Sequence, residues 1–321
     1  MESRELASQE QLPRPTSQES PATTSKPTSP EANPLPIHPT PPSTTTTTTT
    51  NSHPSLHNLL LLSDSALPLG SFAYSSGLES FLAHHNLSGP KSHDATRLSA
   101  FETFLEQSLH NLASTSLPYL LTAWHSPSQL FDLDNDLDAS TLCTVARRAS
   151  INQGRALMGV WERAFASTCS NSSSTNTTTT TSTSASQSLH KFSLALKSPP
   201  PPNHPSSLPE LVPPPTTTPP QAHFAPLFGT ICAALSLSRH STAYIFLLNH
   251  AKAVLSAAVR ASILGPYQNQ AILASGKLQN WIQKCIEGNE ARSWEDARTE
   301  VPVMDLWMGR HELLYSRIFN S

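Results

Sequence analysis

Apolar side chains recur every three or four positions along several stretches of the chain, the period at which residues share one face of an α-helix. The clearest stretch, Leu98–Leu112, carries Glu102 and Glu106 on its opposite face. Asp94 precedes it and can accept hydrogen bonds from the free N–H groups of a first turn. The pattern therefore predicts an amphipathic helix that begins near Asp94. Proline has no N–H to donate, so we expect a helix to end or bend at Pro118.

A second predicted helix starts near Asp138 or Ser140 and runs to Ala166. Its expected buried side chains are Leu142, Val145, Ala149, Leu157, Val160, Trp161 and Ala164. Phe228–Leu237 is apolar nearly all round, which is typical of a helix at the centre of a bundle.

Two more helices are expected nearer the C-terminus. The apolar pattern of Tyr244–Ser262 is followed by Gly265–Pro266, which cannot continue a regular helix. A further helix is expected over Asn269–Ile286. Alternating apolar and polar positions, the pattern of β-strands, are essentially missing from the sequence. The sequence therefore predicts an all-α fold, held together by packing of helix on helix.

Proline, serine and threonine concentrate in two tracts with few large apolar side chains, residues 1–54 and about residues 168–221. Such tracts bury too little apolar surface to offset the entropy lost on ordering. We therefore expect a disordered N-terminal tail over 1–54 and a single helical bundle domain over 55–321. A long disordered insertion is expected to interrupt this domain at about 168–221, where closing a long loop adds little free energy.

Charge and cysteine content exclude several classes of protein. The formal net charge of −3 and the pI near 6.5 leave no basic footprint for nucleic acid. The N-terminus has no apolar signal-peptide core, and no segment reaches the ~18 uninterrupted apolar residues of a membrane span. The four cysteines are widely spaced and form no CxxC pair, which favours reduced thiols. We expect a cytoplasmic protein that binds neither nucleic acid nor a membrane.

Motifs for catalysis and nucleotide binding are missing from the sequence. It contains no GxxxxGK[ST] loop, no HExxH and no GxSxG, so any nucleotide must be bound by a partner. His84 and His85 are adjacent, and neighbours on a helix point about 100° apart, which makes a poor two-ligand metal site. We predict no catalytic residue.

The most informative segment is Leu59–Glu79, with the sequence LLLLSDSALPLGSFAYSSGLE. Taken alone, it predicts a corner between two helices, with Asp64 as a cap, a turn at Pro68–Gly70 and Tyr74 as an aromatic plug. The string also resembles the N-terminal signature of the UreF family of urease accessory proteins, LLQLxDSxxPxGxFxHSxGLE. Many members have histidine at the position of Tyr74, and a phenol with a pKa of about 10 is a poor metal ligand.

Further segments resemble the family in the same order. Arg148–Leu157 is similar to its RxxSxxxGRxL segment, Ala257–Gln270 to its NAVRxxPLGQxxGQ block, and Met308–Ser321 to its MxHExxYSRLFxS tail. Without the resemblance, Arg148 and Arg155 would be read as a solvated helix face, and the tail as a frayed terminal helix.

His223–Gly229 is similar to the family's HxPVxFG entry into a buried helix. His223 stands at the N-terminal end of that helix, where the helix dipole disfavours a charged imidazole. Two roles stay open for it: a neutral residue that caps or packs, and a metal ligand. His223 is thus a candidate metal ligand, but ligand spacing predicts no metal site.

The resemblance implies an all-α protein that forms a homodimer and binds a UreD/UreH-like protein, a UreG-like GTPase and apo-urease. It also implies a non-enzymatic scaffold for urease maturation that assists GTP-dependent nickel insertion, with nickel handled within the complex and no stably bound cofactor. The residues expected to bind partners are Asp64, Tyr74, Glu79, Arg155, Arg260, Arg310, His311, Glu312, Tyr315, Ser316 and Arg317. The long tail and insertion resemble additions in fungal members.

Two alternatives remain open at this point. Arg155 or Arg260 could serve the UreG-like GTPase as an arginine finger, so that the protein regulates GTP hydrolysis. The chain could also be an unrelated helical interaction module, although no internal repeat of about 20 to 50 residues is visible.

Overall fold

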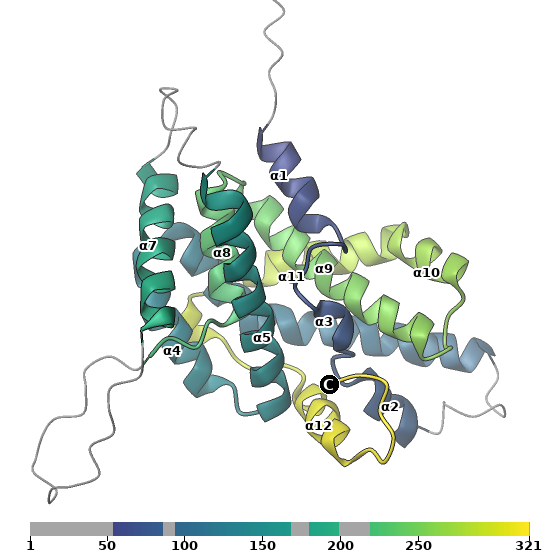
Figure 1. The fold of residues 1–321 in the computed structure, drawn as a ribbon. Helices are drawn as coiled ribbons and strands as arrows, with labels where there is room; N and C mark the ends of the chain where they lie inside the picture. The colour runs from purple at the N-terminus through teal and green to yellow at the C-terminus, as the bar shows by residue number, and fades with distance from the viewer. Residues whose placement is uncertain (1–53, 86–93, 168–179, 199–218, 321) are drawn as a thin grey trace, which may run out of the picture. The chain divides into compact units, whose positions relative to one another are not determined.

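The computed structural model describes residues 54–85, 94–167, 180–198 and 219–320, and every regular element within these ranges is a helix (Figure 1). The predicted all-α fold is confirmed. The predicted disordered tail, 1–54, lies outside the described residues except for Pro54. The α-helices are α1 Pro54–Ser63, α2 Leu78–His84, α3 Asp94–His125, α4 Leu130–Ser140, α5 Thr144–Val160, α7 Thr180–Lys197, α8 Phe224–Ala234, α9 Arg239–Arg260, α10 Pro266–Leu273, α11 Gly276–Asn289 and α12 Pro302–Arg310.

Helix α8 forms the centre of the bundle, as its apolar sequence predicts. All residues from Ala225 to Ala234 are buried, and α8 packs against α3, α5 and α7. Gly229 makes the contact with α3 possible, because a Cβ atom there would lie 2.1 Å from the carbonyl oxygen of Leu120. Helix α9 is long and apolar enough to span a membrane. However, 56% of its most apolar 18-residue stretch is buried among the other helices, as in the core helix of a bundle.

Pro118 does not end the helix that contains it, so of the two predicted outcomes, an end or a bend, the end is wrong. Helix α3 continues through Pro118 to His125. A proline leaves the carbonyl four residues earlier without its usual helical donor. Here that carbonyl belongs to Ser114 and accepts the backbone N–H of Arg298 at 3.2 Å. A distant segment therefore replaces the missing hydrogen bond.

The second predicted helix corresponds to α5 and one turn of π-helix, Trp161–Phe165, that follows it. The helix begins at Thr144, later than predicted, because a separate helix, α4, ends at Ser140. The break falls at Thr141, whose backbone is extended and whose Oγ1 donates to the carbonyl of Leu137 at 2.6 Å. Leu142 follows this break and is 89% exposed, although its place in the period predicts burial. Ala164, in the π-turn, is also exposed.

Part of the predicted disordered insertion is an ordered helix. Helix α7 packs on α8, burying Ala185, Leu189 and Phe192, and the Phe192 ring lies 5.0 Å from that of Phe131. These apolar residues recur at helical spacing, which the surrounding serines and threonines obscure in the composition. The prediction is therefore wrong over 180–198, whereas 168–179 and 199–218 lie outside the described residues.

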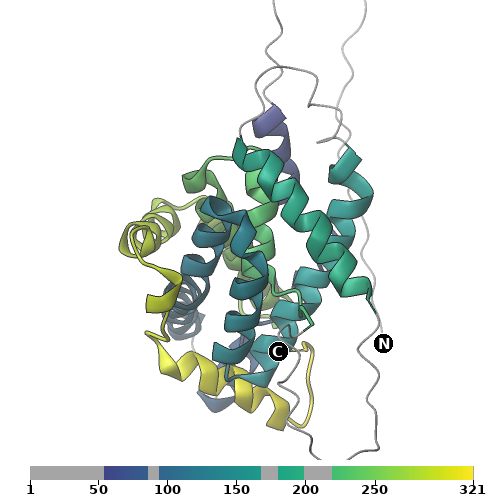
Figure 2. The ribbon, with the colours of Figure 1, turned by 90° about the vertical axis from the view of Figure 1, so that its left-hand side faces the viewer.

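The predicted interruption at Gly265–Pro266 is confirmed, because α9 ends at Arg260 and α10 begins at Pro266. The helix predicted over Asn269–Ile286 is divided between α10 and α11. Ser275 separates them and caps α11, with its Oγ accepting the N–H of Leu278 at 3.2 Å. Helix α12 and the segment after it lie beside α2, at the opposite end of the sequence (Figure 2).

Candidate partner-binding surface

The connection from α1 to α2, residues 64–77, is fixed by turns and by hydrogen bonds from α9. Asp64 Oδ1 accepts the N–H of Ala66 at 2.9 Å. Gly77 has a φ of +85°, and a Cβ there would lie 2.9 Å from the backbone N of Met308. The last carbonyls of α1 accept donors from Asn249 and Lys252, at 2.9 and 2.6 Å. The signature segment is therefore held in a defined shape.

Tyr74 fills the space under this connection. Its side chain is buried, and its hydroxyl accepts a hydrogen bond from Asn152 Nδ2 at 2.9 Å. Asn152 belongs to α5, the helix of the second signature segment. Tyr74 thus joins two of the segments that carry the resemblance.

Glu79 holds the C-terminal segment against α2. Its carboxylate accepts the backbone N–H groups of Ile318 at 2.8 Å and Phe319 at 3.3 Å. His311 is fully buried beside it and donates from Nε2 to the carbonyl of Phe319 at 3.0 Å. The N–H of Asn320 donates to the carbonyl of Ala73 at 2.8 Å. The end of the chain is therefore tied to the first signature segment.

Arg260, at the end of α9, packs on the same segment. Its guanidinium lies 4.4 Å from the centre of the Phe319 ring and donates to the carbonyl of Phe72. Partial burial lowers the pKa of Arg260. Arginine suits this position because one planar group can stack on a ring and donate several hydrogen bonds.

A surface ion-pair network closes the arrangement. Glu312 accepts from Arg148 of α5 at 2.5 Å and from Arg317 at 3.2 Å. Arg148 also donates to the carbonyl of Asn320 at 3.3 Å. The two arginines lower the pKa of Glu312, Arg148 having the larger effect. Exposed pairs contribute little stability, so this network mainly sets the orientation of the tail.

We call residues 64–79 together with 311–320 the tail–loop surface. It presents apolar side chains to solvent: Phe72, Leu313, Tyr315 and Ile318 are all exposed. Exposed aromatic and aliphatic groups beside arginines are typical of protein interfaces. Five predicted site residues are exposed on this surface: Asp64, Glu312, Tyr315, Ser316 and Arg317. Tyr74 and His311 are buried beneath it and Glu79 is largely buried, so these three shape the surface from inside. Arg260 and Arg310 are exposed next to it.

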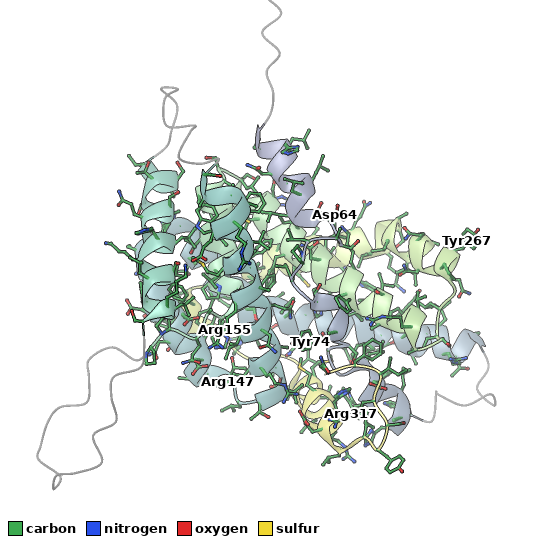
Figure 3. All side chains as sticks on the ribbon, viewed as in Figure 1. Asp64, Tyr74, Arg147, Arg155, Tyr267 and Arg317 are labelled. Atoms are coloured by element: carbon green, nitrogen blue, oxygen red, sulfur yellow. The ribbon has the colours of Figure 1, made fainter. Side chains whose placement is uncertain are left out.

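Arg155 does not belong to this surface. It lies about two turns after Arg148 on α5, and its Nε donates to the carbonyl of Gln221 at 3.3 Å. Tyr267, which belongs to the fourth matching segment, extends away from α10 into solvent (Figure 3). The sequence resemblance alone could not separate these positions from those that meet at the tail.

His223 lies in a buried hydrogen-bond network at the start of α8. Its Nδ1 is 3.0 Å from Ser150 Oγ, and its Nε2 is 2.9 Å from Asp138 Oδ1. Burial tends to raise the pKa of Asp138, but hydrogen bonds from Arg147 and His223 lower it overall. Both ring nitrogens of His223 thus have partners within the protein, which supports the packing role over the metal role.

Sequence reasoning did not identify the two aspartates of this network, Asp134 and Asp138, as residues that hold His223. Asp134 is fully buried and accepts the backbone N–H groups of Gln221, Ala222 and His223, so it caps the N-terminal end of α8 from another helix. Asp134, Asp136 and Asp138 alternate along α4, and this spacing could have drawn attention to them. The presence of charged residues does not by itself predict that one of them is buried. Over the described ranges, no group of three or more His, Cys, Asp or Glu side chains could hold a metal ion.

The UreF family model matches residues 96–277. A protein of Schizosaccharomyces pombe named as an uncharacterized urease accessory protein UreF-like is 33% identical over 271 residues, which cover 84% of this chain and 99% of that protein. Urease accessory protein 6 of Cryptococcus neoformans is 26% identical, over 83% of this chain and 97% of its own length. Urease accessory protein F of Arabidopsis thaliana is 28% identical, over 81% and 90%.

Proposed function

Because this chain belongs to the UreF family of urease accessory proteins, we propose that it acts in urease maturation as a non-enzymatic scaffold. The scaffold binds a UreD/UreH-like protein and a UreG-like GTPase, and assists GTP-dependent insertion of nickel into apo-urease. Nickel is the cargo of this complex, and the protein itself binds no cofactor stably. It works in the cytoplasm as a homodimer.

The tail–loop surface is the observation that carries this proposal. Segments from both ends of the domain meet there, and buried groups such as Glu79 and His311 are used to shape it. The side chains left outside, such as Tyr315 and Ile318, are exposed and have no role in the core. Preorganised apolar side chains with a polar rim are what a protein partner needs. We assign this surface to the UreD/UreH-like protein.

The arginine-finger alternative is favoured at Arg155 rather than Arg260. A finger must reach the transferring phosphate with a free guanidinium. Both side chains are exposed. The Arg260 guanidinium donates to the carbonyls of Phe72 and Ser256 and stacks on the Phe319 ring, whereas Arg155 donates to a single carbonyl. Single-turnover GTP hydrolysis by the UreG-like protein would fall by a factor of about 1,000 or more with Arg155→Ala if this role exists.

The experiment that tests the scaffold is co-purification of point variants with the UreD/UreH-like protein. A Tyr315→Ala, Ile318→Ala double variant removes exposed contact area without touching the core, so helical circular dichroism should be unchanged. We expect loss of co-purification. Tyr267→Ala, which removes an equally exposed ring from α10, is the matched control. Retained binding by the double variant, or equal loss with the control, contradicts the assignment.

A further inference from the structure

A groove of about 450 Å³ lies where the end of α7 meets α5 and the segment before α8. Arg155 of α5 and Glu162 of the π-turn line one side of it, and Lys197 and Ser198 line it from the end of α7. Gln221 lines it from the segment before α8. The groove shares no lining residue with the tail–loop surface, so the proposed scaffold function does not explain it.

Positive charge predominates in this groove. Arg155 and Lys197 are cationic lining residues, and Glu162 is the one carboxylate among the residues that line it. Arg163 adds a third cation at the edge, because its Nη1 would lie 3.1 Å from a Cβ atom on Gly159, which also lines the groove. Lys197 donates to Glu162 at 2.7 Å, so these two charges largely neutralise each other. The groove therefore attracts an anion.

Arg155 has hydrogen-bond donors available for that anion. Its side chain is exposed, and within the described residues it makes one hydrogen bond, from Nε to the carbonyl of Gln221 at 3.3 Å. A guanidinium carries its N–H donors in a planar fork, which matches the oxygens of a phosphate group. The donors that face away from Gln221 can bind a phosphate in the groove.

Ser198 places a hydroxyl at the edge of the same groove. It follows α7 directly, is exposed, and donates from Oγ to the carbonyl of Leu194 at 3.0 Å. In the sequence it is followed by four prolines, Pro199–Pro202. Proline-directed protein kinases phosphorylate a serine or threonine that stands directly before a proline. Ser198 meets that requirement and lies beside the cations that would hold the product.

Ser126 is the other serine or threonine in the described ranges that precedes a proline. It is only partly exposed, its backbone N–H donates to the carbonyl of Thr122 at 2.7 Å, and Pro127 is buried. A kinase must bind both the serine and the proline after it, which this turn prevents while it is folded. Ser198 is thus the accessible one of the two.

We propose that Ser198 is a phosphorylation site and that its phosphate group binds in the groove against Arg155. In the modifying step Ser198 Oγ attacks the γ-phosphorus of ATP bound to the kinase, and the bond from that phosphorus to the leaving oxygen of ADP breaks. The hydroxyl proton passes to the catalytic base of the kinase. The phosphate then joins the end of α7 to α5 and occupies the guanidinium of Arg155.

Mass spectrometry of the full-length protein, after incubation with ATP and a purified proline-directed kinase, tests the modification. We expect phosphate on Ser198 and none on Ser126. Absence of phosphate on Ser198 overturns the proposal.

Phosphoserine encoded genetically at position 198 tests the docking separately. The end of a helix disfavours negative charge and so raises the second pKa of a phosphate that stays in solvent. Contact with guanidinium groups lowers that pKa. The phosphate is titrated by ³¹P NMR, with a phosphorylated peptide spanning 190–205 as the reference. In the protein we expect a second pKa below that of the peptide, with proton affinity weaker by about threefold or more.

Variants identify the group that holds the phosphate. Arg155→Gln should raise the second pKa of the phosphate to the value in the peptide or above. Lys284→Gln, which removes an exposed cation from α11, should leave the second pKa low. Circular dichroism checks the fold of each variant. A second pKa in the parent protein at or above that of the peptide overturns the docking, and so does an unchanged value in folded Arg155→Gln.

Discussion

Glu79 offers the sharpest test of how the tail is held. Its carboxylate accepts two backbone N–H groups, from Ile318 and Phe319, and is largely buried. In Glu79→Gln one carboxylate oxygen becomes an NH₂ group, so one N–H of the tail faces a donor and loses its acceptor. A hydrogen bond to a charged group contributes about 1.5–3 kcal/mol. We therefore expect the free energy that opens the tail to fall by about 2 kcal/mol.

Hydrogen exchange measures this opening directly. A loss of about 2 kcal/mol corresponds to about 30-fold faster exchange of the amides of Ile318 and Phe319. Trypsin should also cleave faster after Arg317, which is exposed. The midpoint of global unfolding should barely change, because the tail lies at the edge of the core.

A matched substitution separates this effect from general loss of charge. Glu295→Gln removes the charge of an exposed carboxylate that does not contact the tail, and it should leave hydrogen exchange of Ile318 and Phe319 unaltered. If Glu79→Gln leaves the exchange of Ile318 and Phe319 at the wild-type rate, Glu79 does not hold the tail and the reasoning is refuted.

Three further changes test the packing. Gly154→Ala would place a Cβ 1.9 Å from the carbonyl oxygen of Ala222. Urea unfolding should therefore show a free energy of unfolding lower by about 2–4 kcal/mol. Gly159→Ala in the same helix meets only the flexible end of Arg163, so it should be neutral or slightly stabilising. Phe192→Ala should cost about 3–5 kcal/mol, whereas the exposed Leu194→Ala should cost little; equal effects would contradict the packing of α7. Burial lowers the pKa of His250 from 6.5 to about 4. Between these pH values the unfolded chain binds a proton that the folded protein does not bind. The free energy of unfolding should therefore fall as pH drops from 6.5 towards 4. The loss should be about 2 kcal/mol after allowance for partial exposure of the ring, and a His250→Gln variant that kept the same pH dependence would contradict this assignment.

The helices with the strongest apolar period could be predicted from the sequence. Leu98–Leu112 and Phe228–Leu237 carry enough large side chains to fix both the helix and its buried face. The end of a helix was expected at Pro118 because proline leaves the carbonyl of Ser114 without a helical donor. The sequence could not show that the distant N–H of Arg298 donates to that carbonyl instead. Helix α7 was missed because composition averages over a tract and hides a few well-spaced apolar residues, such as Leu189 and Phe192.

The contacts among the predicted site residues could not be predicted from the sequence. The resemblance selected Glu79, Arg260 and the tail, but nothing in the spacing indicates that these residues contact one another. Their sequence separation is large, and only packing brings them together. Asp134 was not selected at all, because a buried carboxylate that caps another helix leaves no local pattern in the sequence.

Nickel loading of urease in cells tests the central claim most directly. Cells whose own copy is replaced by the Tyr315→Ala, Ile318→Ala double variant are compared with cells carrying Tyr267→Ala, at matched levels of accessory protein and urease. The account predicts that urease purified from the double variant lacks most of its nickel, while urease from the Tyr267→Ala cells is fully loaded. Fully nickel-loaded urease from the double-variant cells would contradict it.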